Sequence, residues 1–320
     1  MHADLIQQSV DGLRLGSVYD VVEASAQEVA GRLDATVADS AQAIFDDPAI
    51  DAVAICTSTD THIDAMVAAA EAGKAIFCEK PISLDLDEVD RGLDAVSAHD
   101  VFLQIGFNRR FDASHAAVRH AVADGTVGDV HVVRITSRDP APPPIAYIEV
   151  SGGIFLDMTI HDFDMARFVT GSEVTSVYAT GAVRVDSAIG QAGDLDTAVV
   201  VLEHESGAIA AIDNSRQAVY GYDQRVEVFG SGGMAASENP LTNTTILRGP
   251  AGTQYATLPY FFIERYVPSY IAQWEAFAEA VRGGLPSPVT GNDGRAPLLI
   301  GLAAWKSIRE KRPVNISEVT

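Results

Sequence analysis

The chain has 320 residues, of which 47% are hydrophobic and 21% charged, and its formal net charge is −22 at pH 7. A chain of this length is expected to form two domains. The excess of acidic side chains repels a phosphate backbone and argues against nucleic acid as a partner. We find no uninterrupted apolar run of the length that a membrane-spanning helix needs, so we expect no membrane partner.

Cysteine content and the first residues bear on the location of the protein. Cys56 and Cys78 are the only cysteines, too few for a disulfide framework and without the spacing of a metal site. The first residues, MHADLIQQSVDG, have neither the basic region nor the apolar segment of a secretory signal. We therefore expect a cytoplasmic protein without a bound metal.

The first third of the chain alternates short apolar runs with helical patterns. Strand and helix alternating with short links are typical of a parallel, doubly wound α/β sheet. We predict a Rossmann-like, dinucleotide-binding domain over residues 1–108. The predicted strands are 13–21, 51–59, 75–81 and 101–108, and the predicted helices are 24–33, 41–48, 61–74 and 85–100.

Beyond residue 108 the pattern changes to strands separated by turn signals such as HESG and GSGG. Strands joined in this way pair antiparallel, so we predict a second, α+β domain over residues 109–320. Its predicted strands are 130–138, 174–185, 197–215 and 224–237, its predicted helices are 112–124, 158–170, 265–283 and 295–311, and a proline-rich loop, DPAPPP, covers 139–144.

Polar residues follow the predicted strands of the first domain. A doubly wound sheet binds its ligand at the carboxyl ends of its strands. An acidic residue there accepts hydrogen bonds from the adenosine ribose and repels a 2′-phosphate, which favours NAD over NADP. A simple strand-end turn is the alternative for any one of these residues. The candidate cofactor-binding residues are Asp20, Thr57, Ser58, Thr59, His62, Glu79 and Lys80.

One element of a dinucleotide-binding domain is absent from the sequence. Such a domain opens with a strand and a GxGxxG turn about 20 residues before the ribose acid. Here Asp20 is preceded by the helix-like MHADLIQQSV. Either the given start is internal to a longer reading frame, which we favour, or the chain is a variant with impaired cofactor binding.

The segment SGGIFLDMTIHDFDMARFVTG, residues 151–171, carries a candidate catalytic pair. Asp157 and His161 are four residues apart, which on a helix puts both side chains on one face. A carboxylate beside an imidazole suits general-base catalysis, because it orients the ring and stabilises its charged form. A histidine satisfied within a helix is the alternative. A metal site of Asp157, His161 and Asp164 lacks an obvious fourth ligand, so we predict none.

Four segments of the chain resemble one protein family. The stretches CTSTDTHIDAMVAAAEAGKAIFCEKPISL, GFNRRFD, SGGIFLDMTIHDFDMARFVTG and NSRQAVYGYDQRVEVFGSGGM resemble the glucose-fructose oxidoreductase/inositol dehydrogenase family. The similarity covers nearly the whole chain, and the combination of EKP with DxxxHD is its most specific part. The absent glycine turn is a departure from the family pattern.

The resemblance implies roles for residues of both domains. Lys80 would hold the substrate hydroxyl oxygen, and Glu79 would lie near the nicotinamide ribose. A cis peptide would precede Pro81. Asp157 would orient His161, which would take the hydroxyl proton while hydride leaves the same carbon for NAD.

Substrate contacts and assembly are implied in the same way. One arginine of the RR pair would lie near the substrate, and we take Arg109. Strand alternation puts Tyr220 and Tyr222 on one face, and we take Tyr220 as the contact to a sugar hydroxyl. The family also implies a homo-oligomer, a dimer or tetramer, in which partner subunits cover the sheet of the second domain.

The implied function is NAD-dependent oxidation of a secondary hydroxyl of a cyclic polyol, with myo-inositol at its 2-hydroxyl as the leading substrate. Another inositol isomer or a sugar is the alternative within the same class. A noncatalytic polyol-binding protein is the alternative outside that class. The absent glycine turn favours the binding protein, whereas the joint presence of Lys80, Asp157 and His161 favours the enzyme.

Overall fold

A computed structural model describes residues 1–319. The chain divides into two compact units, the first made of Met1–Asn108 with Ser269–Ala296, and the second of Arg109–Pro268 with the residues from Pro297 onward. The first unit is thus assembled from two separate stretches. This differs from the second domain predicted from sequence, which runs unbroken from residue 109.

Aromatic packing explains why the stretch 269–296 joins the first unit. Helix α11 (Phe262–Gly283) carries Trp274 and Phe277, both nearly fully buried. The ring centroids of Trp274 and Phe77 are 4.3 Å apart. Those of Phe277 and Phe77 are 6.2 Å apart, and these two rings meet edge to face. Such pairs add to the free energy gained by burying the rings. The C-terminal half of α11 therefore completes the core of the first unit.

The first unit contains parallel strands in two groups. Strands β1 and β2 pair with each other, and β3, β4 and β5 form a three-stranded sheet in that order. The parallel pairing agrees with the strand–helix alternation, although the predicted strand 13–21 is reduced to two residues. The elements are β1 (Ser17–Val18), β2 (Thr36–Val37), β3 (Ala52–Ile55), β4 (Ala75–Cys78), β5 (Leu103–Ile105), α1 (His2–Gln8), α2 (Glu23–Leu33), α3 (Ala41–Asp46), α4 (His62–Glu71) and α5 (Leu86–Ala98).

Local sequence signals set the helix ends around β4. Helix α4 ends before Gly73, which has a φ of +70°. Glycine adopts this left-handed conformation without the steric strain that a Cβ would cause. Asp85 caps α5, because its side chain accepts from the backbone N–H groups of Asp87 and Glu88. Between these helices, Ile76, Phe77 and Cys78 of β4 are fully buried. The turn after β4 is therefore anchored on both sides by regular structure.

The second unit is built on a seven-stranded sheet in the order β11-β10-β6-β9-β8-β7-β14. All neighbours pair antiparallel except β6 and β9, which are parallel. A largely antiparallel sheet is what the turn signals predict. The strands are β6 (Val130–Arg138), β7 (Val174–Ala182), β8 (Thr197–His204), β9 (Ile209–Ser215), β10 (Asp223–Gly230), β11 (Gly233–Ser237) and β14 (Val314–Asn315).

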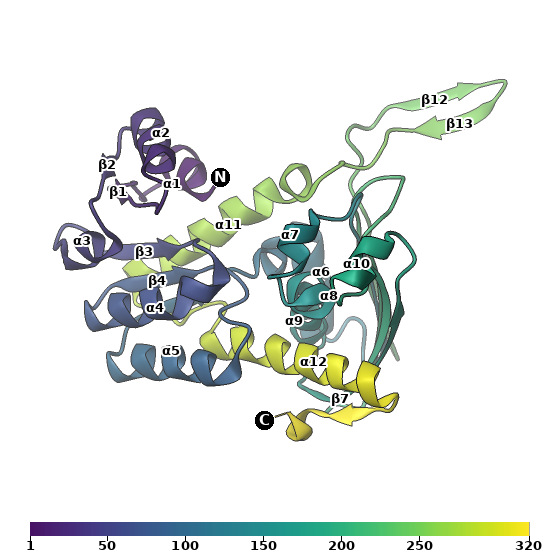
Figure 1. The fold of residues 1–320 in the computed structure, drawn as a ribbon. Coiled ribbons are helices and arrows are strands. Elements are labelled where there is room, and N and C mark those ends of the chain that lie inside the picture. Colours follow the sequence, from purple (N-terminus) through teal and green to yellow (C-terminus); the bar gives the residue numbers. More distant parts are fainter. Residues whose placement is uncertain (320) are drawn as a thin grey trace. The chain divides into compact units, whose positions relative to one another are not determined.

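Helices pack on one face of this sheet (Figure 1). The core between them joins alternate residues of the strands, such as Val133 and Ile212, to helix residues such as Phe163 and Ile300. Strand alternation leaves the other face to large exposed apolar side chains. The helices are α6 (Ala113–Ala123), α7 (Ile145–Ile148), α8 (Gly153–Asp157), α9 (Ile160–Thr170), α10 (Ser187–Gln191) and the part of α12 (Gly291–Glu310) from Pro297 onward.

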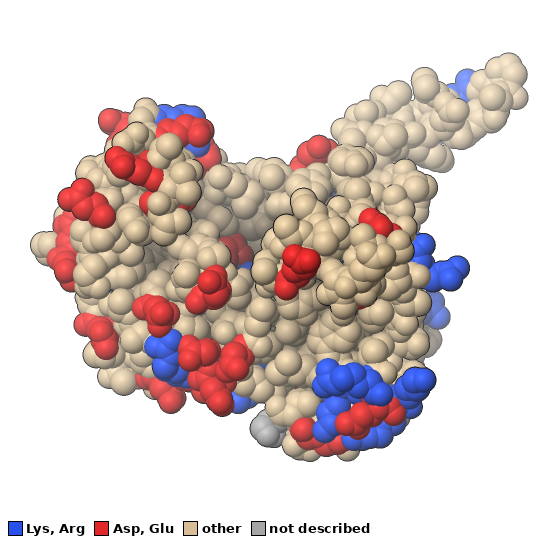
Figure 2. All heavy atoms as spheres, in the orientation of Figure 1, with Lys and Arg blue, Asp and Glu red and all other residues tan. Residues whose placement is uncertain are grey.

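A two-stranded arm, β12 (Ile246–Gly249) with β13 (Gly252–Tyr255), projects from the second unit (Figure 1). Its residues are exposed, and Arg248 is its one charged residue. By contrast, acidic side chains are prominent on the face of the first unit drawn in Figure 2. None of the helices in the described part of the chain is both long and apolar enough to span a membrane.

Candidate active site

The loop after β3 presents hydroxyl groups. Thr61 Oγ1 donates to the Ser58 carbonyl at 2.8 Å and lies 2.7 Å from Thr57 Oγ1, from which it can accept. Thr59 opens the short 3₁₀ turn Thr59–Thr61 that leads into α4. Thr57 and Ser58 are exposed, so this loop offers hydrogen-bonding groups at the carboxyl end of the sheet.

Glu79, Lys80 and Pro81 form the turn after β4, and the Lys80–Pro81 peptide is cis, as the resemblance implies. The Lys80 backbone N–H donates to Glu79 Oε2 at 3.1 Å, so the carboxylate folds back on its own turn. Gly106, just after β5, leaves the space for it. A Cβ at that position would lie 2.8 Å from the Glu79 carboxyl carbon.

His62 is placed differently from the cofactor contact predicted from sequence. Its side chain is buried, its Nδ1 lies 2.9 Å from the Pro81 carbonyl, and its Nε2 lies 3.1 Å from the Thr57 carbonyl. Both ring nitrogens therefore face backbone oxygens within the protein. The arrangement favours a supporting role, in which His62 connects the β3 loop to the turn of Lys80.

Asp20 follows β1 at the surface. Its Oδ1 accepts from the Val22 backbone N–H at 2.8 Å, which fixes the carboxylate near the strand end. An exposed, oriented carboxylate at this place can accept hydrogen bonds from the hydroxyls of a ribose. Its negative charge would repel a 2′-phosphate.

These residues fit part of a dinucleotide. The carboxylates of Asp20 and Glu79 and the hydroxyls after β3 are acceptors and donors suited to ribose hydroxyls and to the nicotinamide end. The sequence contains no GxGxxG turn, so the groups described here are those at the strand ends.

In the second unit, the carboxylate of Asp157 is held from two sides. Tyr147 Oη donates to Asp157 Oδ1 at 2.8 Å, and Arg216 Nη1 donates to Asp157 Oδ2 at 3.1 Å. Burial and the charge of Asp157 raise the pKa of the Tyr147 hydroxyl above its ordinary value, so the hydroxyl stays a donor. Tyr147 lies just after the proline-rich loop 139–144.

Asp157 and His161 do not share one regular helix. Asp157 is the last residue of α8, and His161 is the second residue of α9, after the link Met158-Thr159. The two residues therefore lie on consecutive helices and not on the single helix that the four-residue spacing predicts. Gly152 and Gly153, both with positive φ, start a short separate helix that the local pattern does not separate from the next.

Arg109, predicted as a substrate contact, lies in a buried polar cluster. Its Nη1 donates to Asp162 Oδ1 at 2.8 Å, and Asn214 Nδ2 donates to Asp162 Oδ2 at 2.7 Å. Thr159 Oγ1 donates to Asn214 Oδ1 at 2.7 Å. A direct substrate contact by Arg109 thus has less support than a role in organising this cluster.

Two carboxyl groups near the cluster have raised pKa values. Burial raises the pKa of Asp139 to about 6, against the opposing charges of Arg109 and Arg216. Burial likewise raises the pKa of Asp162 to about 6, with Arg109 again opposing it. The second unit therefore concentrates carboxyl groups and arginines in a site of low water content.

Tyr220 and Tyr222 do not lie on one face of a strand. Both precede β10, in a turn where strand alternation does not apply. Tyr220 is half exposed, and its Oη donates to Asp223 Oδ2 at 2.7 Å and accepts from Arg138 at 2.9 Å. Tyr222 is buried, with its Oη 3.4 Å from Arg109 Nη2. Tyr222 is thus the tyrosine that joins the buried cluster, whereas Tyr220, the one taken from sequence as the sugar contact, lies half exposed outside it.

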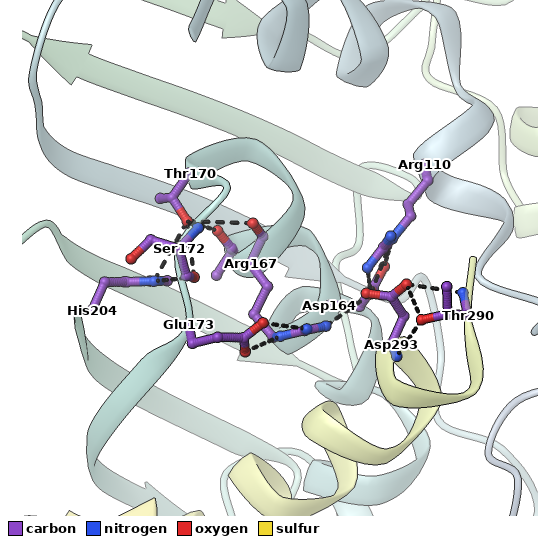
Figure 3. A network of polar contacts seen from close by, with 10 residues as sticks. Arg110, Asp164, Arg167, Thr170, Ser172, Glu173, His204, Thr290 and Asp293 are labelled. Atoms are coloured by element: carbon purple, nitrogen blue, oxygen red, sulfur yellow. Dashed lines mark hydrogen bonds and ion pairs between the residues drawn. The ribbon is translucent and has the colours of Figure 1, made fainter. Parts of the chain in front are cut away.

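Asp164, considered above as a third metal ligand, belongs to an ion-pair network (Figure 3). Its carboxylate accepts from Arg110 Nε and Nη2 at 2.6 to 3.1 Å, and Arg167 pairs with Glu173 at 2.6 Å beside it. The described residues contain no group of three or more side chains arranged to hold a metal ion. Asp164 has a structural role in the second unit.

The chain matches known proteins along its whole length. Residues 1–107 match the model of an oxidoreductase family with an NAD-binding Rossmann fold, and residues 115–236 match the GFO/IDH/MocA C-terminal domain. It is 50% identical over 320 residues to the myo-inositol 2-dehydrogenase of Thermotoga maritima, covering 100% of this chain and 96% of that protein.

The chain also matches solved structures of dehydrogenases along nearly its whole length. The crystal structure of a probable dehydrogenase from Thermotoga maritima superposes with a TM-score of 0.98 at 49% identity, covering 100% of this chain and 96% of the other. A scyllo-inositol dehydrogenase from Lactobacillus casei, with bound NAD(H) and scyllo-inositol, gives a TM-score of 0.92 at 28% identity, covering 99% and 95%.

Fold and site residues thus define an oxidoreductase with a Rossmann-like, NAD-binding unit. The chain belongs to the GFO/IDH/MocA family. This confirms the family resemblance of the four segments quoted above.

Proposed function

We propose that the protein is an NAD-dependent dehydrogenase that oxidises the 2-hydroxyl of myo-inositol to a ketone. The observation that carries the proposal is the 50% identity, over the full chain, to a myo-inositol 2-dehydrogenase. The residues Lys80, Asp157 and His161 supply the cation, carboxylate and imidazole that such a reaction uses.

The proposed chemistry divides among these residues. NAD, when bound, accepts the hydride that leaves the hydroxyl-bearing carbon. An imidazole nitrogen of His161 takes the hydroxyl proton, so that a ketone forms as the C–H and O–H bonds break. Asp157, fixed by Tyr147 and Arg216, orients the imidazole and stabilises its charged form. The ammonium of Lys80 holds the substrate oxygen and stabilises negative charge on it.

The cofactor contacts are part of the same proposal. Asp20 accepts from the adenosine ribose, Glu79 accepts from the nicotinamide ribose, and the hydroxyls of Thr57, Ser58 and Thr59 line the cofactor. His62 supports the Lys80 turn from beneath. Tyr222 is added as a candidate for shaping the substrate site, and Tyr220 is kept as a peripheral contact.

A homo-oligomer, a dimer or tetramer, also belongs to the proposal. One large apolar side chain from each of five of the seven strands is exposed on the sheet of the second unit, which favours cover by another subunit. These residues are Tyr178, Val199, Ile209, Phe229 and Met234. We place the enzyme in the cytoplasm, where Cys56 and Cys78 remain free thiols.

Another inositol isomer is the second candidate substrate. The observation that favours it is the scyllo-inositol bound in the related Lactobacillus casei enzyme. Epimers differ in the orientation of one hydroxyl, so the same catalytic groups serve either substrate.

NADH formation from NAD and a panel of inositols and sugars tests the function. We expect the highest kcat/KM with myo-inositol and a loss of at least about 100-fold in His161→Gln. His120→Gln is the matched control, because His120 is exposed on α6 and should leave the rate unchanged. A silent wild-type protein with every polyol, despite measurable polyol binding, would establish the noncatalytic alternative.

A further inference from the structure

We propose that His2 and Trp274 are positioning residues that hold the Glu79 carboxylate in one orientation. The inference rests on the proposed function, in which Glu79 serves the nicotinamide ribose. All three residues lie in the first unit. Trp274 Nε1 donates to His2 Nδ1 at 3.0 Å, and His2 Nε2 lies 2.9 Å from Glu79 Oε1. These contacts connect a buried indole to the turn that carries Lys80.

The indole determines the tautomer of His2. An indole N–H only donates, so His2 Nδ1 acts as an acceptor and carries no proton. The proton of the neutral ring is then on Nε2, the nitrogen beside Glu79. This N–H lies beside Glu79 Oε1, an oxygen that is shielded from water and makes no hydrogen bond to the described part of the chain, so the contact between the two groups is electrostatic. Without the indole, either nitrogen could carry the proton, and a bare Nε2 would repel the carboxylate.

Aromatic packing keeps the His2 ring in place. Its centroid lies 5.7 Å from that of Phe77, 5.5 Å from that of Tyr270 and 5.8 Å from that of Trp274, the last two edge to face. Trp274 and Phe77 are almost completely buried. The ring therefore has little freedom to rotate away from Glu79, and its orientation is set before any ligand binds.

The carboxylate of Glu79 is confined on its other sides as well. Oε2 accepts from the Lys80 backbone N–H, and the missing side chain of Gly106 leaves just the room that the carboxyl group occupies. The side chain keeps 19% of its surface exposed, through which it can accept from a ribose hydroxyl. Because the orientation is already fixed, binding does not have to order this group.

The contacts of His2 and Trp274 with the Glu79 turn should affect cofactor binding more than the chemical step. Glu79 would contact a part of NAD that does not react, so its contribution is similar in the ground state and the transition state. Loss of its orientation should raise the KM for NAD about five-fold, the effect of one hydrogen bond, with a smaller change in kcat and in the KM for the polyol. A general loss of folding would change all three.

Nitrogen NMR of histidine in the protein without cofactor reads the tautomer directly. In the wild type we expect His2 Nδ1 at the chemical shift of an unprotonated ring nitrogen and Nε2 at that of a protonated one. In Trp274→Phe, which keeps an aromatic ring and removes the N–H, both signals should move toward the average of the two tautomers. Trp305→Phe removes the other indole N–H, in the second unit, and should leave the His2 signals in place.

His2→Gln and His2→Leu complete the test. The glutamine amide offers both an acceptor and a donor, so we expect it to retain most of the NAD affinity, whereas leucine should lose it as Trp274→Phe does. A wild-type His2 with its proton on Nδ1 would overturn the proposal, as would a Trp274→Phe protein with unchanged His2 signals and unchanged KM for NAD. The NMR result needs no turnover, so it separates failure of this device from failure of the dehydrogenase function.

Discussion

The Arg216 guanidinium donates to Asp157 Oδ2 at 3.1 Å from a position that is only 1% exposed. The same guanidinium pairs with Asp194 at 3.2 Å. One buried cation therefore compensates two carboxylates, one of which is the proposed partner of the catalytic histidine.

Arg216→Gln should lower both stability and turnover. The substitution leaves two carboxylates without their cation, which in buried pairs costs about 3 kcal/mol or more of the free energy of unfolding. Chemical denaturation measures the loss, and steady-state kinetics should show kcat falling more than the KM for NAD rises. Arg134→Gln removes an arginine whose pair with Glu227 is largely exposed, and it should cost less than about 1 kcal/mol. Equal losses in the two variants would contradict this account.

Gly106→Ala should weaken NAD binding. A Cβ there would lie 2.8 Å from the Glu79 carboxyl carbon, so the carboxylate must move away from its position. We expect a rise of about five-fold in the KM for NAD, measured at saturating polyol. Gly31→Ala is the matched control, because a Cβ there meets no atom within 4 Å and the residue lies inside α2. That change should stabilise the protein by about 0.5 kcal/mol and leave the KM unaltered.

Asp20→Ser should shift cofactor preference toward NADP. The substitution removes both the ribose acceptor and the negative charge that repels a 2′-phosphate. The ratio of kcat/KM for NAD to that for NADP should fall at least about ten-fold, with NAD itself less well bound. Asp11→Ser changes the net charge by the same amount at another exposed position and should leave the ratio as it is. An unchanged ratio in Asp20→Ser would remove Asp20 from the cofactor site.

His115 should make the protein less stable in mild acid. Burial lowers the pKa of His115 from 6.5 to about 4, although the Asp112 charge opposes this. The unfolded chain then binds the proton more readily than the folded one between these values. The stabilisation from neutral His115 is complete above pH 6.5 and is lost as the pH falls to 4, by about 3 kcal/mol in all.

Replacement of the imidazole isolates this effect. His115→Gln cannot titrate, so its unfolding free energy should fall less than that of the wild type between pH 7 and pH 4. Asp139, whose raised pKa acts in the opposite direction over part of this range, is present in both proteins and cancels in the difference. Parallel curves for the two proteins would show that His115 is not the titrating group.

The two-domain chain, the parallel and antiparallel sheets and the EKP turn could be predicted from sequence because each depends on local patterns. Apolar runs followed by polar residues mark the ends of β3 and β4 whatever the rest of the chain does. The segment 269–296 could not be assigned in this way, because its helix is placed by contacts of Trp274 with a strand some 200 residues earlier.

In the candidate site, too, some features could be predicted from local sequence and others depend on tertiary contacts. Lys80 and His161 are noticed because their neighbours form rare combinations of residue types. The break between α8 and α9 falls at Met158-Thr159, which a four-residue spacing does not reveal. Strand alternation does not separate Tyr220 from Tyr222, because both lie in a turn before β10, and only tertiary burial distinguishes them.

Transfer of deuterium from myo-inositol labelled at carbon 2 tests the central claim most directly. The protein, NAD and the labelled polyol are mixed, and the mass of the NADH formed is measured. We predict NADH that carries one deuterium, since hydride moves from that carbon to the nicotinamide. Unlabelled NADH would show that another carbon is oxidised, and no NADH, from a folded protein that binds NAD, would contradict the dehydrogenase function itself.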